Sequence, residues 1–271
     1  MKLLEPGSYF QQLSSRIGGA QVNYHFNVSL KNRYLYVQTS KCACTFIKAG
    51  LTRFELADLQ YFDDHYRHTK HANVIQNALQ NGPHQTVNRA VFVKPYQLGE
   101  RGFDALLDDQ QYFKFAIIRN PYSRILSAFL DAIVDRRPPL LNLLPELAEL
   151  MAVTPRQALT EQVSFKQFLL ALQLKVERFG WGAVDQHFRQ LHFHLSDDII
   201  SYSKLYKVEE LDLFERDFAE RHGQPFPKVQ RGAHTKSAKS QLASYYDQSC
   251  RALVAGLYKE DLERFGYKFS L

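Results

Sequence analysis

The most constraining feature of the sequence is an apolar run that ends in an arginine and passes straight into a helix start. The segment 113–118 (FKFAII) is apolar apart from one lysine, which is typical of a strand buried on both faces of a parallel sheet. Asn120 and Pro121 follow in the N-cap and first-turn positions that these residue types prefer. Arg119 therefore lies at the carboxyl end of a buried strand, where open α/β sheets place their ligands.

The rest of the chain repeats this alternation of strands and helices. Further strands are expected over 34–37, over 89–94 and within 199–208, where 205–208 has the strongest pattern. Helices are expected over about 45–54, 121–133, 140–151, 164–170, 211–221 and 241–265. The pattern predicts an α/β fold with a P-loop-like parallel sheet flanked by helices, in one domain over residues 1–271.

Composition does not decide whether the ligand is a polyanion, but it indicates a cellular compartment. Lys and Arg number 34 against 28 Asp and Glu, a net charge of +6 that suits a polyanionic ligand or simply a basic surface. The 3 cysteines include Cys42 and Cys44, which are too close for an ordinary disulfide and lack a second pair for zinc. Reduced thiols, no signal-peptide core and no apolar stretch of roughly 20 residues favour a cytoplasmic protein without a transmembrane segment.

The loop after the first strand has the composition of an anion site. An anion at a strand-to-helix turn meets backbone N–H groups and the positive end of the helix dipole. Lys41 adds a mobile positive charge, and Ser40 and Thr45 add hydroxyl groups. The loop has no glycine, so it is not a Walker A loop. The alternative is an ordinary turn with an exposed lysine.

A second candidate anion site starts at Arg119. This residue can offer a planar fork to a phosphate, and Ser127, two helical turns into the following helix, can offer a hydroxyl. The alternative is that Arg119 closes a salt bridge at the edge of the sheet.

Together, in this order, the two segments resemble the motifs of the carbohydrate sulfotransferases that use 3′-phosphoadenosine 5′-phosphosulfate (PAPS), a group that includes the Golgi chondroitin enzymes and bacterial relatives. Residues 39–45 (TSKCACT) are similar to the family's P-K-x-x-C-T loop, with Ser40 in place of proline. Residues 119–129 (RNPYSRILSAF) are a nearly complete match to R-[DN]-P-[FY]-x-R-[LI]-x-S-A-[FY]. Weaker likenesses lie at 164–169, at 185–190, where Arg189 replaces a usual proline, at 207–211 and at 258–267.

The resemblance implies an enzyme that transfers a sulfuryl group from PAPS to a hydroxyl, with a glycan as the first-choice acceptor ahead of a lipid-linked sugar or a small alcohol. Lys41 would be catalytic at the leaving oxygen, and Arg119 and Ser127 would bind the 3′-phosphate. The implied PAPS loop comprises Ser40, Lys41, Cys42, Ala43, Cys44 and Thr45.

Lys236, in the basic loop 231–239, would close over the nucleotide, although this loop is equally well read as a solvated turn. The helical stretch at about 140–190 would be an insertion on the acceptor side. The family's chemistry implies neither a metal nor a nucleic-acid partner.

The acceptor hydroxyl also needs a general base, and histidine is the usual choice near neutral pH. His71 is favoured because it lies between the two motifs and resembles the family's histidine-containing helix start. His65 and His187 are expected to contact the acceptor, with His187 as the rival base. The chain has 10 histidines, and any one of them is more often structural than catalytic.

Two other classes of protein remain as alternatives. A P-loop kinase would explain the loop lysine, but the Walker glycines and an apolar strand ending in a Mg²⁺-binding aspartate are missing. A non-enzymatic polyanion-binding module would explain the charge, the 15 Tyr and the 20 Phe. It does not explain the spacing of Arg119 and Ser127 behind a buried strand. The sequence does not identify the acceptor or the oligomeric state.

Overall fold

The computed structural model describes residues 7–57, 91–229 and 241–269. The chain packs as two compact units. The first comprises Met1–Thr39, Ala43–Ile117 and Asp198–Gly232, and the second comprises Ser40–Cys42, Ile118–Asp197 and Ala233–Leu271. The expectation of one 271-residue domain stays a prediction.

The first unit is built on an open, mostly parallel sheet. Within the described residues this sheet has four strands in the order β1 (Phe26–Ser29), β2 (Tyr34–Val37), β3 (Phe113–Ile118) and β4 (Lys204–Lys207). β1 and β2 form an antiparallel pair with Phe26 opposite Val37. β2 and β3 are parallel, with Tyr34 opposite Phe113. Every residue of β2 and β3 is buried, which explains why both read as continuous apolar segments.

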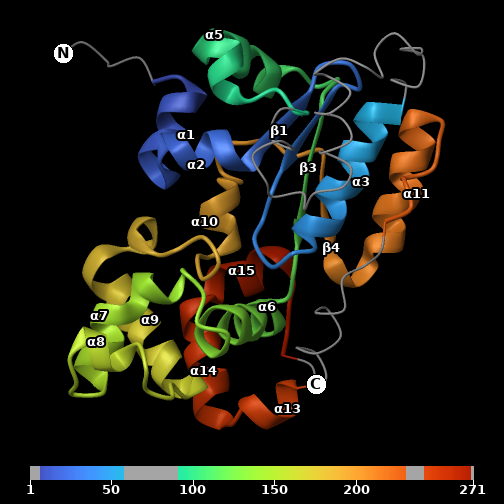
Figure 1. Cartoon of the computed structure of the whole chain (residues 1–271). Helices are drawn as coiled ribbons and strands as arrows, with labels where there is room; N and C mark the ends of the chain where they lie inside the picture. The colour runs from blue at the N-terminus through green and yellow to red at the C-terminus, as the bar shows by residue number, and fades with distance from the viewer. Residues whose placement is uncertain (1–6, 58–90, 230–240, 270–271) are drawn as a thin grey trace, which may run out of the picture. The chain divides into compact units, whose positions relative to one another are not determined.

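Helices cover both faces of this sheet (Figure 1). One side carries α3 (Cys44–Leu56) and α11 (Leu211–His222), where the rings of Phe54 and Phe218 meet at 4.8 Å. The other side carries α1 (Tyr9–Ile17), α2 (Gly19–His25) and α5 (Pro95–Asp108), and here Phe103 packs on Phe26 at 5.7 Å. The sheet is thus flanked by helices on both faces, as the α/β pattern predicts.

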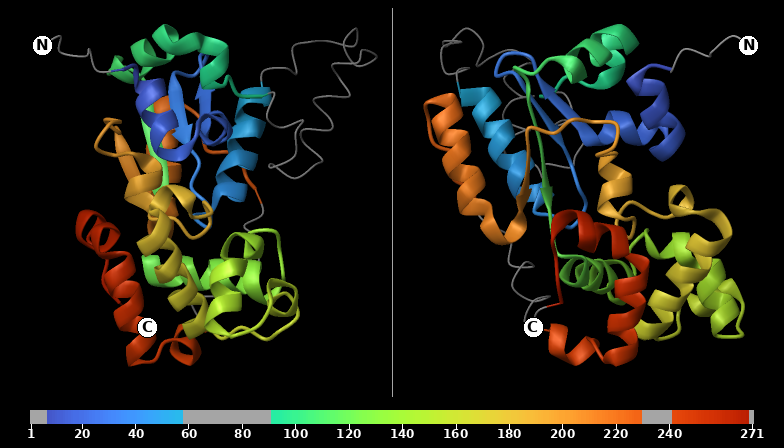
Figure 2. Two further views of the ribbon diagram at one scale, coloured as in Figure 1. Left: turned by 90° about the vertical axis from the view of Figure 1, so that its left-hand side faces the viewer. Right: turned by 180° about the vertical axis from the view of Figure 1, so that it is seen from behind.

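The second unit is helical in its described part (Figure 2). Its central helix is α6 (Pro121–Phe129), which continues into η3 (Leu130–Val134), a single turn of π-helix. The other helices of the unit are α7 (Leu140–Leu150), α8 (Pro155–Ala158), α9 (Phe165–Phe179), η4 (Trp181–Ala183), α10 (Leu191–Leu195), α13 (Leu242–Tyr245), α14 (Gln248–Leu257) and α15 (Lys259–Phe265). Ile125, Leu126 and Phe129 of α6 belong to a buried core shared with α7, α9, α13 and α14, while α8 packs on α7 and α10 on α15.

The structure corrects three of the expected elements. Of the strand expected over 89–94, the described part forms only a single antiparallel bridge, between Val93 and Val28. The helix expected over 241–265 is broken into α13, α14 and α15. The first break has a local cause, because the Asp247 side chain caps α14 by accepting from the Cys250 N–H. β1 joins the sheet although the pattern there did not predict a strand.

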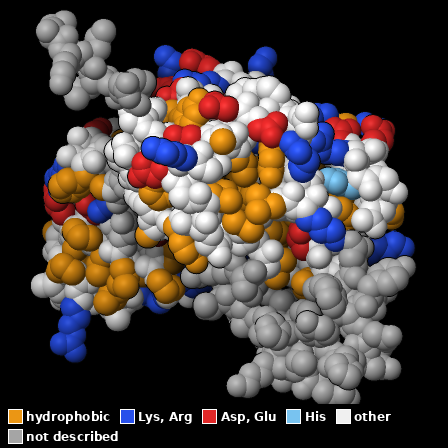
Figure 3. All heavy atoms as spheres, turned by 90° about the horizontal axis from the view of Figure 1, so that it is seen from above, with side chains coloured by type: hydrophobic (Ala, Val, Ile, Leu, Met, Phe, Trp, Pro, Cys, Tyr) orange, Lys and Arg blue, Asp and Glu red, His pale blue; other side chains and the backbone are white. Residues whose placement is uncertain are grey.

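The basic excess of the chain is not gathered on the face drawn in Figure 3. Lys and Arg side chains lie beside Asp and Glu side chains over the described surface in that view, with apolar groups between them. This face therefore carries no extended field of one sign.

Candidate functional site

The loop between β2 and α3 holds an unusual backbone. Lys41 and Ala43 both have left-handed conformations, with φ of 64° and 56°. Such conformations cost free energy at non-glycine residues, and they persist where the surroundings fix them. Between them Cys42 is fully buried. A strained loop without glycine therefore occupies the position where the family's phosphate loop is expected.

In the first unit, this loop begins and ends on fixed elements. The Thr39 hydroxyl donates a hydrogen bond to the carbonyl of Ile117, which ties the end of β2 to the end of β3. α3 begins at Cys44 with Ala43 as its N-cap, and its first turn holds no acidic residue. The N-terminal turn of a 13-residue helix with this composition favours an anion.

In the second unit, Arg119 contacts the loop directly. Its guanidinium donates from Nη1 to the carbonyl oxygen of Lys41 at 3.1 Å and from Nε to the Ser123 hydroxyl at 3.0 Å. Asn120 caps α6 by accepting from the Tyr122 N–H, as its sequence position predicts. The side chain of Arg119 is buried, so the two motifs meet at a guanidinium held away from solvent.

Lys41 forms an ion pair with a residue that the sequence did not single out. Its Nζ lies 2.9 Å from Oδ2 of Asp131 in η3, and Arg137 binds the other carboxylate oxygen at 3.1 Å. Burial by itself would raise the pKa of the Asp131 carboxyl. The hydrogen bond and charge of Lys41, with the charges of Arg137 and His187, outweigh burial and lower that pKa. Asp131 is therefore an anion at neutral pH.

Ser127 lies on the same side of this helix as these groups. Residues four apart share a helix face, so Ser127 stands between Ser123, which contacts Arg119, and Asp131, which contacts Lys41. The π-turn of η3 continues α6 directly at this point, and such turns occur often at functional sites.

Arg124 fastens the loop to a distant segment of the second unit. This fully buried guanidinium donates to the carbonyl of Ser40 at 3.1 Å, of Gln186 at 3.1 Å and of Arg189 at 2.6 Å. One side chain thus places the residue before Lys41 beside the residue before His187. The sequence showed Arg124 as part of the second motif but gave it no role.

The segment that carries His187 has several other supports. Asp185 Oδ1 lies 2.6 Å from Nδ1 of His187 and also accepts from the His187 N–H at 2.9 Å. Tyr258 donates its hydroxyl to the carbonyl of Phe188, and the buried Asp261 accepts from the N–H groups of Leu191 and His192. The closing likeness at 258–267 is explained here, because Tyr258 and Asp261 hold this segment in place.

The departure from the family pattern at Arg189 also has a structural role. Its guanidinium donates to the carbonyl of Val184 at 2.8 Å and of Gly182 at 3.1 Å. The arginine therefore closes the turn that carries Asp185 and His187.

The candidate residues fall into three sets. Ser40, Lys41, Cys42, Arg119, Ser127 and His187 belong to the second unit, and Ala43, Cys44 and Thr45 to the start of α3 in the first. His65, His71 and Lys236 lie outside the described residues. Sequence reasoning missed Asp131, for which the available signal was its position four residues after Ser127. It placed Asp185 in the likeness at 185–190 but gave it no role.

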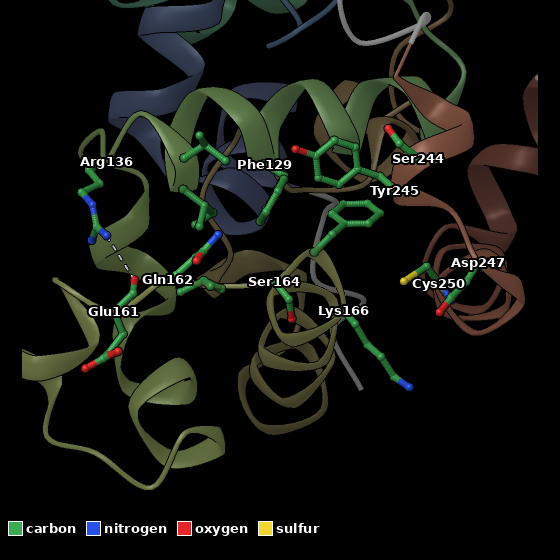
Figure 4. A pocket seen from close by; sticks show the side chains of 14 residues that line it. Phe129, Arg136, Glu161, Gln162, Ser164, Lys166, Ser244, Tyr245, Asp247 and Cys250 are labelled. Atoms are coloured by element: carbon green, nitrogen blue, oxygen red, sulfur yellow. Dashed lines mark hydrogen bonds between the residues drawn. The ribbon is translucent and has the colours of Figure 1, made fainter.

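A pocket of about 470 Å³ opens in the second unit (Figure 4). Aromatic rings of Phe129, Phe165 and Tyr245 contribute to its lining. Polar groups surround them, among them Ser164, Ser244, Glu161, Gln162, Lys166 and Asp247. Arg136 crosses one side and donates to the carbonyl of Glu161 at 3.2 Å. The pocket thus combines apolar faces with hydrogen-bonding groups.

Within 7–57, 91–229 and 241–269, no group of three or more His, Cys, Asp or Glu is arranged to hold a metal ion. In the same ranges no helix combines the length and apolarity needed to cross a membrane.

The first unit is thus an α/β sheet whose β2 leads into a lysine loop, and in the second unit an arginine precedes α6. Loops and helix starts of this composition favour anions. Residues 24–268 match the model of the sulfotransferase family, and the chain belongs to that family. No curated protein and no solved structure matches the chain. Family membership makes it an enzyme of sulfuryl transfer and implies PAPS as the donor and a hydroxyl-bearing acceptor.

Proposed function

We propose that this protein transfers the sulfuryl group of PAPS to a hydroxyl of a carbohydrate. The observation that carries the proposal is the contact between the two motifs, 78 positions apart, in which the Arg119 guanidinium meets the Lys41 carbonyl. PAPS carries a 5′-phosphosulfate and a 3′-phosphate. One cation for each, Lys41 in the first motif and Arg119 in the second, would account for both motifs.

The residues present fit such a donor. Lys41 offers an ammonium group, Arg119 a guanidinium, and Ser127 a half-buried hydroxyl. In the proposal Arg119 and Ser127 hold the 3′-phosphate, and residues 40–45 hold the 5′-phosphosulfate. PAPS supplies a sulfuryl group on a good leaving phosphate. Lys41 neutralises the negative charge that develops on the leaving oxygen, which is the main catalytic requirement of a loose transition state.

The proposal needs no metal ion. A sulfuryl group carries less charge than a γ-phosphoryl group, and Lys41 supplies a positive charge where Mg²⁺ acts in phosphoryl transfer.

The pocket of Figure 4 supports a carbohydrate as the acceptor. Sugar rings present apolar C–H faces and polar hydroxyl edges, and ligand sites pair apolar rings with a few placed polar groups. Tyr245 is the partly exposed ring of the lining, next to the buried Phe129 and Phe165, and Ser164 and Ser244 offer exposed hydroxyls. The pocket and Lys41 are linked through η3. This turn contributes Ile133 and Val134 to the pocket lining, and its Asp131 forms the ion pair with Lys41.

A transfer screen tests the function. Purified protein is incubated with [³⁵S]PAPS and a panel of neutral and acidic glycans, lipid-linked sugars and simple alcohols, and label in each acceptor is counted. We expect transfer to glycans to exceed transfer to the other classes. Calorimetry with 3′-phosphoadenosine 5′-phosphate (PAP) and with ATP runs in parallel. Preference for ATP would favour the kinase alternative, and transfer only to small alcohols would overturn the carbohydrate assignment.

A further inference from the structure

Asp185 and His187 form a hydrogen-bonded pair with the geometry of an acid–base dyad. Oδ1 of Asp185 lies 2.6 Å from Nδ1 of His187, and the imidazole keeps 26% of its surface exposed. The backbone of the pair is fixed, because Asp185 N–H donates to the side-chain oxygen of Asn142 at 2.9 Å. The ring is therefore oriented and still open to solvent.

The carboxylate determines which ring nitrogen can accept a proton. Burial by itself would raise the pKa of Asp185, but hydrogen bonds from the His187 ring and backbone, with the charges of His187 and Arg189, hold that pKa below its usual value. An ionised carboxylate can only accept, so Nδ1 must carry the proton in the neutral imidazole. Nε2 then has the lone pair that a general base requires.

The dyad also lies beside the proposed catalytic lysine. Arg124 donates to the carbonyls of Ser40 and Gln186, the residues that immediately precede Lys41 and His187, at 3.1 Å each. Asp131 links the two groups a second time: it binds Lys41 at 2.9 Å, and the charge of His187 acts on its carboxyl.

The other described histidines of the second unit do not share this arrangement. His192 lies with Nδ1 3.0 Å from Asp261 and Nε2 2.8 Å from Glu260, so carboxylates occupy both ring nitrogens. His194 is buried, with only 2% of its surface exposed. Within the described part of this unit, His187 alone combines an orienting carboxylate, an exposed ring and proximity to the lysine loop.

We propose that His187, oriented by Asp185, is the general base of the transfer reaction. The inference rests on the proposed sulfotransfer and replaces His71 in that role. Nε2 of His187 takes the proton of the acceptor hydroxyl as the acceptor oxygen forms its bond to sulfur. The bond between sulfur and the bridging phosphate oxygen breaks, and its electron pair stays on that oxygen, next to Lys41. The imidazolium then releases its proton to solvent.

Charged groups from three parts of the second unit lie around this base. Asp185 and Arg189 lie on its own turn, and Asp131 faces it from η3. Lys41 and Arg137 act through Asp131, to which both are bound.

The experiment uses the full-length protein and the release of labelled sulfate from [³⁵S]PAPS, in which water stands in for the acceptor hydroxyl. His187→Ala should bind PAP with wild-type affinity by calorimetry and release sulfate about 10²- to 10⁴-fold more slowly. Added imidazole should restore part of the rate. His192→Ala is the matched control, because it removes another carboxylate-bound histidine of the same unit and should keep the wild-type rate.

Asp185→Asn tests the positioning role and serves if His187→Ala fails to fold. Without the carboxylate, Nδ1 of His187 loses the acceptor that orients the ring, so the turnover rate should fall while PAP affinity stays at the wild-type value. Asp185→Glu, which keeps a carboxylate, should restore part of the rate. Wild-type turnover in Asp185→Asn would overturn the dyad. Full activity in His187→Ala would also overturn the proposal. The same holds if His71→Ala loses turnover and His187→Ala does not. If the wild type neither binds PAP nor releases sulfate, the sulfotransfer proposal itself has failed.

Discussion

The ammonium group of Lys41 lies 2.9 Å from the carboxylate oxygen Oδ2 of Asp131. We propose that Lys41 stabilises the charge on the leaving oxygen. In the structure this lysine is already paired with a protein carboxylate. Arg137 binds the same carboxylate at 3.1 Å, so Asp131 keeps one cation when Lys41 turns to the nucleotide. If Lys41 exchanges Asp131 for the nucleotide, Lys41 keeps an anionic partner and Asp131 keeps Arg137.

Lys41→Ala should abolish most of the transfer while leaving the fold intact. Removing a group that stabilises charge in the transition state typically slows a reaction about 10²- to 10³-fold. Initial rates with [³⁵S]PAPS, together with thermal unfolding, measure this. Lys259→Ala is the control, because that lysine is 72% exposed and pairs only loosely with Glu263 at 3.8 Å. Wild-type turnover in the Lys41 variant would remove Lys41 from the mechanism.

Asp131→Asn should tighten binding of PAP. The substitution removes the anion that competes for Lys41, and a partly exposed ion pair is worth up to about 1 kcal/mol, which corresponds to roughly fivefold in affinity. Calorimetry at low and high salt checks the sign, and the gain should shrink as salt screens the charges. Weaker binding at both salt concentrations would show that Asp131 helps to build the site.

Arg119→Ala should weaken PAP binding about 10- to 100-fold, because a hydrogen bond to a charged group contributes about 1.5–3 kcal/mol. Affinity for the analogue without a 3′-phosphate should change much less, so the ratio of the two dissociation constants is the diagnostic quantity. Arg264→Ala removes a 43%-exposed arginine of the same unit and should change neither constant. Equal losses for both nucleotides would place Arg119 in the support of the Lys41 loop and not on the 3′-phosphate.

The sequence predicted the elements that are defined by local signals. β2 and β3 are fully buried runs, and α6 begins at an Asn–Pro pair that caps it as expected. The break in the helix over 241–265 depends on the side chain of Asp247, which the apolar periodicity of the segment conceals. The bridge between Val28 and Val93 depends on tertiary pairing, which no local pattern contains.

The same division holds for the candidate site. Lys41 and Arg119 belong to contiguous motifs and could be named from the sequence. The partners that give the site its geometry come from elsewhere: Asp131 lies 90 positions after Lys41, and Arg124 bridges 84 positions to Ser40 and 65 to Arg189. A single sequence shows neither contact, because both arise only when α6 packs beside the loop.

Gly50→Ala should destabilise the first unit even though alanine is the better helix former. A Cβ at Gly50 would lie 2.0 Å from a ring atom of Phe226, so the ring must move out of its packed position. Overpacking of this kind costs up to about 3 kcal/mol and outweighs the helix-propensity gain of about 1 kcal/mol. Urea unfolding should therefore show a net loss of about 2 kcal/mol. Gly256→Ala in α14 is the control, since nothing lies within 4 Å of its Cβ position; an equal loss there would rule out the Phe226 contact as the cause.

His222 should make the protein less stable as the pH falls below neutrality. Burial first, and the charge of Arg221 second, lower the pKa of this imidazole from 6.5 to about 4. Its ring packs 4.4 Å from Phe218 and 5.1 Å from Phe54, and within the described residues its buried Nε2 has no hydrogen-bond partner. Between about pH 6.5 and pH 4 the unfolded chain binds a proton that the folded protein excludes, so this contribution to stability is present above 6.5 and is lost on acidification.

The slope of that loss is at most about 1.4 kcal/mol per pH unit, and less where solvent screens the half-buried ring. His222→Phe isolates the contribution, because phenylalanine keeps the aromatic packing and cannot bind the proton. The free energy of unfolding, measured in urea from pH 7.5 to pH 4, should fall more steeply for the wild type than for the variant, since the carboxylates that also titrate are common to both. Parallel curves over that range would show that His222 binds its proton as readily in the folded protein as in the unfolded chain.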